Sequence, residues 1–255
     1  TKLFRESLSK KSHHLPSFFV IPSLIGSGAE SSMTAILNTS RKKEIKVDEN
    51  FLPNGIIYDL NILKKLPNEK LIPGHLDAIS HCIESLTSFN KNLFSEFLAL
   101  SSLQQFINHC YSGSFSFEEA SRSDLAQLAL LSFNGGICQN NSGAGLTHAL
   151  AHSLESLFGK EHALCIAFFL PVVLKYIYEI DADFPLKSDS NLNLHLDKNI
   201  SMLRKNGFFT DMINYLQIES NLDSCLDLAS LDPCWRLFYK KVDSLKLKDL
   251  LINYL

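Results

Sequence analysis

Residues 145–163 read GLTHALAHSLESLFGKEHA, and this stretch places three histidines among small and apolar residues. His148 and His152 are four positions apart, so on an α-helix their side chains share one face about one turn from each other. His162 follows a glycine-containing break at 158–161 (FGKE) that can turn the chain back. The stretch therefore predicts a helix with two histidines on one face and a third histidine just beyond its end.

A second pair of candidate ligands lies about seventy residues upstream, in residues 72–84 (IPGHLDAISHCIE), where Asp77 and His81 are also four apart. Imidazole nitrogens and carboxylate oxygens bind divalent transition metals, and four such donors from two helix faces and a turn make a metal site. For a lone histidine, a solvated or hydrogen-bonded structural role is the more common explanation. Two pairs at helical spacing in an apolar region leave both explanations open.

The composition is that of a globular chain with a sizeable core. The 255 residues are 45% hydrophobic and carry a formal net charge of −3, which is enough apolar material for one large domain or two smaller ones. The sequence has no long basic run and no basic-aromatic interleaving, so nucleic acid is not an expected partner. The longest apolar run, 163–174, is too short to span a bilayer. It predicts a buried helix and no membrane contact.

The six cysteines are scattered and form no C-x-x-C pair, and no signal peptide is recognisable at the start of the sequence. Reduced thiols and a cytoplasmic location are therefore the expectation. We interpret Cys82 and Cys138 as packed core thiols. His109 and His195 have no partners at recognisable spacing, and we interpret them as surface residues. His75 lies next to the candidate ligand helix and could face a substrate, but a surface role is the favoured interpretation.

Strand-like and helix-like segments divide the chain. Short apolar runs at 18–22, 33–38 and 51–59 predict strands, and the Gly/Ser turn at 23–28 after the first of them has backbone N–H groups that can approach a phosphate. Beyond Asp59 the pattern is helical. Helices are predicted over 75–88 and 90–109, from a cap at Ser116, from 143, and over 164–180. The sequence thus predicts a mostly α protein, with a small α/β part at 1–72 and an all-helical part at 73–255.

Two motifs resemble the signatures of the iron-containing alcohol dehydrogenases. The first joins an acidic strand end (57–59, IYD), a proline at 67 and the helix pattern G-x-x-D-A-[LI]-x-H-x-x-E, all present through residue 84. The second, G-x-x-H-x-x-A-H, starts at Gly145, and a His-Ala pair follows ten residues beyond it. The resemblance covers about residues 17–180. It implies a dehydroquinate synthase-like fold, with a partial nucleotide-binding domain in 1–72 and a metal-binding catalytic domain in 73–255.

Carried over by position, the resemblance implies a metal site and a proton-transfer residue. The four metal ligands fall on Asp77, His81, His148 and His162, and they would hold Fe²⁺, Zn²⁺ or another divalent ion. His152 matches a histidine that is not a ligand, and the resemblance implies that it relays a proton or orients the substrate.

The resemblance also implies an NAD or NADP cofactor. The turn PSLIGS at 22–27 matches the family's P-T-T-x-G-T segment, which makes Ser23, Leu24 and Ser27 cofactor contacts, and Lys43 matches a lysine near the cofactor ribose. Leu24 replaces a threonine, so one hydrogen bond to the cofactor is lost. The family's G-G-G-S-type turn for the pyrophosphate has no counterpart in this sequence. We therefore expect either a fragment or a chain with incomplete dinucleotide binding.

The implied reaction is NAD(P)-linked interconversion of a small alcohol and its aldehyde or ketone, with the metal polarising the substrate oxygen for hydride transfer. Glu155 and Lys160 stand where the family usually has small aliphatic residues. The substrate can therefore be sugar-like or phosphorylated, or the two changes can be unrelated to the substrate. One alternative is a sugar-phosphate cyclase or lyase of the dehydroquinate synthase type, against which the fourth ligand argues. The other is a truncated metal-binding relative without catalysis. A homodimer is a further expectation, and Trp235 and Arg236, after Asp232-Pro233, resemble the family's late asparagine-proline-arginine segment.

Overall fold

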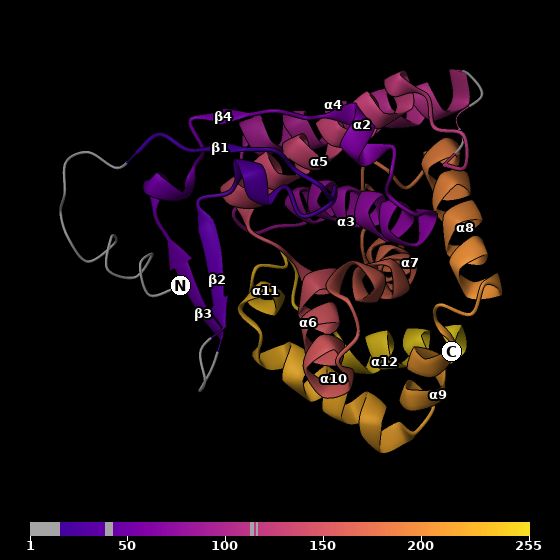
Figure 1. The fold of residues 1–255 in the computed structure, drawn as a ribbon. Helices are drawn as coiled ribbons and strands as arrows, with labels where there is room; N and C mark the ends of the chain where they lie inside the picture. The colour runs from indigo at the N-terminus through magenta and orange to yellow at the C-terminus, as the bar shows by residue number, and fades with distance from the viewer. Residues whose placement is uncertain (1–15, 39–42, 113–114, 116) are drawn as a thin grey trace.

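The computed structural model describes residues 16–38, 43–112, 115 and 117–255. Its strands form two small sheets beside a larger helical body (Figure 1). β1 (Phe19–Val20) pairs in parallel with β4 (Gly55–Ile56), and β2 (Thr34–Asn38) forms an antiparallel hairpin with β3 (Lys43–Val47). Two 3₁₀ turns, η1 (Ala29–Ser31) and η2 (Glu49–Phe51), lie between these strands.

Helices make up most of the described chain, which confirms the predicted mostly α fold. They are α2 (Leu60–Leu63), α3 (Asn68–Leu86), α4 (Leu93–Ser112), α5 (Arg122–Ser142), α6 (Leu146–Phe158), α7 (His162–Ile180), α8 (Ser190–Lys205), α9 (Thr210–Leu216), α10 (Glu219–Leu231), α11 (Pro233–Arg236) and α12 (Ser244–Tyr254). α3 lies in the middle of this body and packs against α4, α5, α6, α7 and α8. Its side chains therefore reach both halves of the helical body.

The start of α3 differs from the prediction. The helix begins at Asn68 and runs through Pro73, so the predicted start at His75 is wrong. Proline inside a helix removes one backbone hydrogen bond and crowds the preceding turn. Residues 71–86 are nevertheless all buried, and this burial outweighs the local penalty of the proline. The boundary placed between residues 72 and 73 falls inside α3, and the division into two domains stays a prediction.

The starts of α5 and α6 also differ from the prediction by a few residues. The predicted cap at Ser116 lies outside the described residues, and α5 begins after Ser121, whose side chain forms a capping box with Asp124. α6 begins at Leu146, after Gly145. A capping box satisfies two helix-end N–H groups at once, which fixes where α5 starts.

α7 is the apolar core helix that the sequence predicts, but it is longer than the apolar run alone. By length and composition its 19 residues are sufficient to cross a membrane, yet two-thirds of its apolar window is buried inside the protein. It packs against α3, α6, α8 and α12. Burial of this kind is what a core helix shows.

The glycine-rich turn after β1 packs directly on α3. Gly26 has a φ of +128°, and a Cβ atom there would lie 2.6 Å from the carbonyl oxygen of Gly74 in α3. The Gly26 N–H donates a hydrogen bond to Ser132 Oγ of α5 at 2.8 Å. Only glycine suits this backbone conformation and this close approach. The turn is thereby fixed to the two helices behind it.

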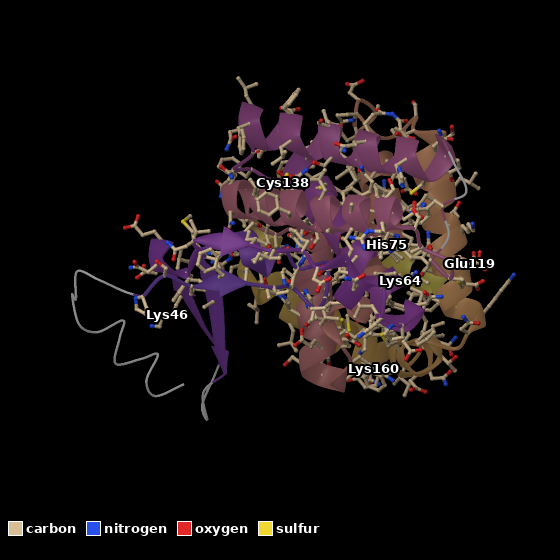
Figure 2. The ribbon with its side chains drawn as sticks, turned by 45° about the horizontal axis from the view of Figure 1, so that its top comes forward. Lys46, Lys64, His75, Glu119, Cys138 and Lys160 are labelled. Atoms are coloured by element: carbon tan, nitrogen blue, oxygen red, sulfur yellow. The ribbon has the colours of Figure 1, made fainter. Side chains whose placement is uncertain are left out.

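Two histidines interpreted as surface residues are buried. His75 of α3 is fully buried, His195 of α8 is 5% exposed, and their Nε2 atoms lie 3.0 Å apart. The surface interpretation was wrong because it used local spacing, whereas this pair forms between distant helices. His75 lies within the helical body (Figure 2), as does Cys138, which is buried together with Cys82 as predicted.

His109, also interpreted as a surface residue, is partly buried. The side chain of His109 is 24% exposed, and its Nε2 lies 2.6 Å from Asp124 Oδ1. It is therefore partly buried and paired with Asp124, in contrast to the interpretation as a surface residue. All six cysteines are free thiols, as expected of a chain with reduced cysteines.

Candidate metal centre

Three of the four predicted metal ligands converge in the interior. His81 Nε2 lies 3.0 Å from His148 Nε2, and Asp77 Oδ1 lies 3.7 Å from the first of these nitrogens and 3.6 Å from the second. With metal–ligand bonds of about 2.0 to 2.2 Å, donors on one tetrahedral ion are spaced by roughly 3 to 4 Å. The three donor atoms already have this spacing, so α3 and α6 present them as one ligand group.

Asp77 Oδ1 shows that these residues fit a cation. It is buried without a hydrogen-bond partner, and it faces two ring nitrogens. Leaving a buried carboxylate oxygen without a hydrogen bond is costly. A divalent ion between the three donors removes that cost, because carboxylate oxygen and imidazole nitrogen are both good ligands for Fe²⁺ and Zn²⁺.

Glu84 fixes the orientation of His148. Its carboxylate accepts hydrogen bonds from the backbone N–H of Gly145 at 2.8 Å and of His148 at 3.0 Å, which are at the start of α6. The same carboxylate lies 2.5 Å from His148 Nδ1. A carboxylate at a helix N-terminus satisfies unpaired N–H groups and the helix dipole. Because Nδ1 is turned to Glu84, Nε2 of His148 faces the metal position.

The pKa values in this group follow from burial and from these contacts. Burial alone would raise the pKa of Glu84, but the charge and hydrogen bond of His148 lower it to about 2. Burial alone would lower the pKa of His148, but Glu84 raises it above the ordinary value. Burial lowers the pKa of His81 to about 4. His81 is therefore neutral near pH 7, as a metal-binding imidazole must be.

Sequence spacing contained a signal for Glu84 as a partner of the ligands. Asp77, His81 and Glu84 are at positions i, i+4 and i+7 of α3, so they share one face of the helix. Glu84 was predicted only as a member of the motif pattern, and the structure shows what it contacts.

His162, the fourth predicted ligand, lies beside the group. It starts α7, and its ring centroid is 5.4 Å from that of His148. Its donor atoms are not among the mutually close set formed by Asp77, His81 and His148. Its Nδ1 lies 3.3 Å from Glu155 Oε2. The structure therefore brings His162 next to the other three, and its role as a ligand stays a prediction.

His152 lies on α6 next to both histidines of the site, with ring centroids 5.8 Å from His148 and 5.4 Å from His162. Its Nδ1 lies 3.0 Å from Asp232 Oδ2, at the start of α11. Sequence reasoning missed Asp232 as a partner of His152. Asp-Pro is a recognisable helix-start signal, but it says nothing about a contact with a residue 80 positions away.

The predicted cofactor contacts lie on the turn that packs on α3. Ser23, Leu24 and Ser27 are exposed. Gly74, which touches this turn, is three residues before Asp77, so the turn and the ligand group lie about one helical turn apart along α3. Lys43 starts β3, but its side chain lies outside the described residues.

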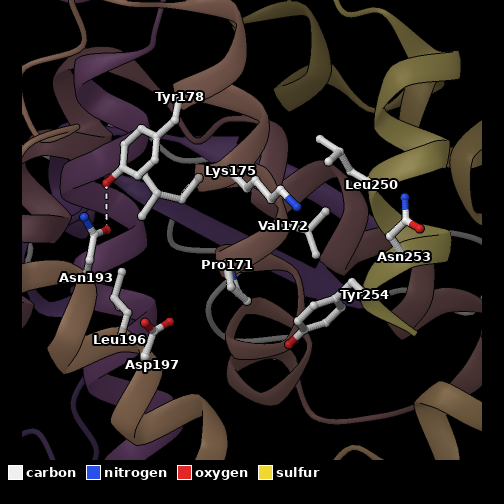
Figure 3. A pocket seen from close by; sticks show the side chains of 11 residues that line it. Pro171, Val172, Lys175, Tyr178, Asn193, Leu196, Asp197, Leu250, Asn253 and Tyr254 are labelled. Atoms are coloured by element: carbon white, nitrogen blue, oxygen red, sulfur yellow. Dashed lines mark hydrogen bonds between the residues drawn. The ribbon is translucent and has the colours of Figure 1, made fainter.

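A cavity of about 380 Å³ lies elsewhere, between α7, α8 and α12 (Figure 3). Lys175, Tyr178 and Asn193 are among its lining residues, and Tyr178 donates a hydrogen bond to Asn193 at 2.9 Å. The lining does not include the metal ligand group. This cavity is therefore separate from the candidate metal centre.

The whole arrangement is similar to solved iron-containing alcohol dehydrogenases. The enzyme from Thermococcus thioreducens matches with a TM-score of 0.75 and 18% identity, over 96% of this chain and 67% of that chain. The enzyme from Corynebacterium glutamicum matches with a TM-score of 0.74 and 22% identity, over 94% of this chain and 67% of that chain. At these identities the likeness shows that the chain has the fold of this class of protein.

Sequence comparison identifies the family. Residues 71–230 match the family described as Fe-containing alcohol dehydrogenase, C-terminal. This match covers more than half of the chain, so the chain belongs to the Fe-containing alcohol dehydrogenase family.

Individual relatives match a part of their own length. Alcohol dehydrogenase 4 of Saccharomyces cerevisiae is 29% identical over 160 residues, which are 61% of this chain and 41% of that protein. The NADPH-dependent butanol dehydrogenase of Clostridium saccharobutylicum is 25% identical over 162 residues, 62% of this chain and 40% of that protein. The chain thus spans about two-fifths of the length of these relatives.

Proposed function

We propose that this chain is the metal-binding part of an NAD(P)-linked dehydrogenase that interconverts a small alcohol and its aldehyde or ketone. The observation that carries the proposal is the buried, unpartnered Asp77 Oδ1 facing Nε2 of His81 and His148. Membership of the family supports the reaction class. Similar proteins are named for butanol and for lactaldehyde, which supports a small substrate.

In this proposal the residues have separate tasks. Asp77, His81 and His148, with His162 from the start of α7, would hold Fe²⁺ or another divalent ion, which supplies Lewis-acid polarisation of a substrate oxygen. Glu84 keeps His148 in the orientation that a ligand needs.

His152 has the proton-transfer task. Hydrogen bonding to His152 lowers the pKa of Asp232 below its ordinary value, against the effect of burial. The ionised Asp232 accepts from Nδ1 of His152, which leaves Nε2 as the nitrogen that takes and gives a proton.

The cofactor would lie along the exposed side of the turn at 22–28. The exposed hydroxyls of Ser23 and Ser27 offer donors to a phosphate or ribose, while the Gly26 N–H is already bonded to Ser132. Leu24 offers an apolar contact in place of a hydrogen bond. Because the turn packs on Gly74 of α3, the residues that would hold the cofactor are attached to the helix that carries Asp77 and His81.

A phosphorylated substrate receives no support from Lys160. Its ammonium group lies 2.9 Å from Asp211 Oδ2, so its charge is already paired. Glu155 likewise contacts His162. Lys160 and Glu155, which differ from the family pattern, therefore both have partners within the protein. We favour a small uncharged alcohol as the substrate.

Metal analysis tests the ligand group. Purified wild type, Asp77→Asn, His148→Ala and the control His109→Ala are loaded with Fe²⁺ without oxygen or with Zn²⁺, dialysed, and assayed for bound metal. We expect the Asp77 and His148 variants to lose one bound equivalent relative to wild type, and the control to keep it. Unchanged metal content in both variants would contradict the site.

Titration with NADH and NADPH tests cofactor binding separately. If the chain binds neither, it is a metal-binding relative that does not carry out the redox reaction.

A further inference from the structure

A second group of possible metal ligands lies at the junction of α6 with α11. His152, Asp232 and Cys234 offer an imidazole nitrogen, a carboxylate oxygen and a thiol sulfur, and these atoms lie within 4.8 Å of one another. All three residues are partly buried. None of them belongs to the group of Asp77, His81 and His148, although His152 lies one helical turn from His148.

The backbone holds this second group in place. Asp232 caps α11 and accepts a hydrogen bond from the Cys234 N–H at 2.7 Å through Oδ1. Its other oxygen, Oδ2, lies 3.0 Å from His152 Nδ1. α6, which carries His152, packs against α10 and α11. The carboxylate is thus fixed between the other two donors.

The spacing and type of the donors fit one tetrahedral ion. With Zn–N of about 2.0 Å and Zn–S of about 2.3 Å, ligand atoms on one zinc are spaced by roughly 3 to 4 Å. The contact between His152 and Asp232 has this spacing, and the donor atom of Cys234 lies within 4.8 Å of the other two. A set of nitrogen, oxygen and sulfur donors suits zinc and similar ions, while Mg²⁺ and Ca²⁺ prefer oxygen alone.

The local charge also favours a cation. Within the described part of the chain, the ion pairs of Asp77, Glu84 and Asp232 are all with histidines. A bound cation would offset the charge of the Asp232 carboxylate and stabilise the Cys234 thiolate.

We propose that His152, Asp232 and Cys234 form a second metal site, for a thiol-binding divalent cation of the zinc type. The site has three protein ligands and one open position. Binding there replaces the hydrogen bond between His152 Nδ1 and Asp232, because the same nitrogen cannot donate a proton and bind an ion. An ion at this site therefore withdraws His152 from proton transfer. The binding itself does not depend on the proposed dehydrogenase activity.

Cobalt spectroscopy tests this second site. Co²⁺ bound to a thiolate gives a charge-transfer band in the near ultraviolet, and the group of Asp77, His81 and His148 contains no sulfur. The full chain is kept reduced with a phosphine and titrated with Co²⁺ as wild type, Cys234→Ser, Asp77→Asn and Cys110→Ser. Cys110 is a matched control, because it is a partly buried free thiol outside the ligand group.

We expect the band in wild type, in Asp77→Asn and in Cys110→Ser, and its loss in Cys234→Ser. Asp232→Asn is a second variant that should weaken Co²⁺ binding at this site while keeping the helix cap. No thiolate band in wild type at saturating Co²⁺, or a band that persists in Cys234→Ser, would overturn the proposal. Failure of the Asp77 group would instead show as unchanged cobalt binding in Asp77→Asn, so the two proposals fail separately.

Discussion

Glu84 accepts three hydrogen bonds, and through them it joins the helix that carries Asp77 and His81 to the start of the helix that carries His148. Two of the donors are backbone N–H groups of Gly145 and His148, and the third is the His148 ring. A Cβ atom on Gly145 would lie 3.2 Å from the Glu84 side chain. The carboxylate, the glycine and the ligand histidine therefore form one packed unit.

Replacing Glu84 with glutamine tests this unit. Glutamine keeps the size but loses the charge that orients His148, and loss of such a ligand partner weakens metal affinity by roughly 10- to 100-fold. We expect that loss in a Zn²⁺ competition titration with a chromophoric chelator. Glu96→Gln is the matched control, because Glu96 pairs with Lys91 at the protein surface. Wild-type affinity in Glu84→Gln would show that Glu84 supports the fold only.

α8 is attached to α3 by the buried histidine pair. His75 and His195 lie 3.0 Å apart through their Nε2 atoms, and the ring of Phe106 lies 5.5 Å from that of His195. Burial lowers the pKa of His195 to about 4 and lowers that of His75 well below the ordinary value. Both rings are therefore neutral in the folded protein near pH 7, and one ring donates a hydrogen bond to the other.

This pair predicts a loss of stability in mild acid. The folded pKa of His195 is below the unfolded value of 6.5, so between these values the unfolded chain binds a proton that the folded chain does not. Stability is present above pH 6.5 and falls as the pH drops toward 4, by about 2 kcal/mol for His195 between pH 6.5 and 5. Urea unfolding at these two pH values measures the loss.

The double variant His75→Leu, His195→Leu should lose less stability over the same pH interval than wild type, because the two buried titrating rings are gone. His109→Gln, at a partly exposed position, should keep the wild-type dependence. An equal pH dependence in the double variant and wild type would contradict this account of the α3–α8 contact.

The four-residue spacing of polar side chains predicted which site residues lie together on one helix. Asp77 and His81 share a face of α3, and His148 is one turn from His152 on α6, so helical period alone grouped them in pairs. The start of α3 was not predictable in this way, because burial of the whole helix outweighs the local signal of Pro73. Helix existence follows from periodicity, while helix ends depend on tertiary contacts.

Contacts between residues on distant helices could not be predicted from the local sequence pattern. His75 and His195 are 120 positions apart, and His152 and Asp232 are 80 apart. Nothing in the local pattern of one partner reports the other, so the first pair was taken for surface residues and Asp232 was missed. Spacing alone did not decide whether Asp77, His81 and His148 bind a common metal. The resemblance to a family predicted that they do.

On the scale of the whole molecule, α3 connects the three parts of the proposed function. It carries two ligands and Glu84, and the glycine-rich turn packs on its first half. Through α6 it meets the group of His152, Asp232 and Cys234. The central claim is that α3 and α6 together hold a divalent cation.

Anomalous X-ray diffraction from a crystal of the Zn²⁺-loaded chain, recorded on both sides of the zinc absorption edge, tests that claim most directly. We predict an anomalous peak between Asp77 Oδ1 and Nε2 of His81 and His148, with each bond at about 2.0 to 2.2 Å. We also predict that His162 supplies the fourth ligand. A zinc-saturated crystal with no peak among these three side chains would contradict the account.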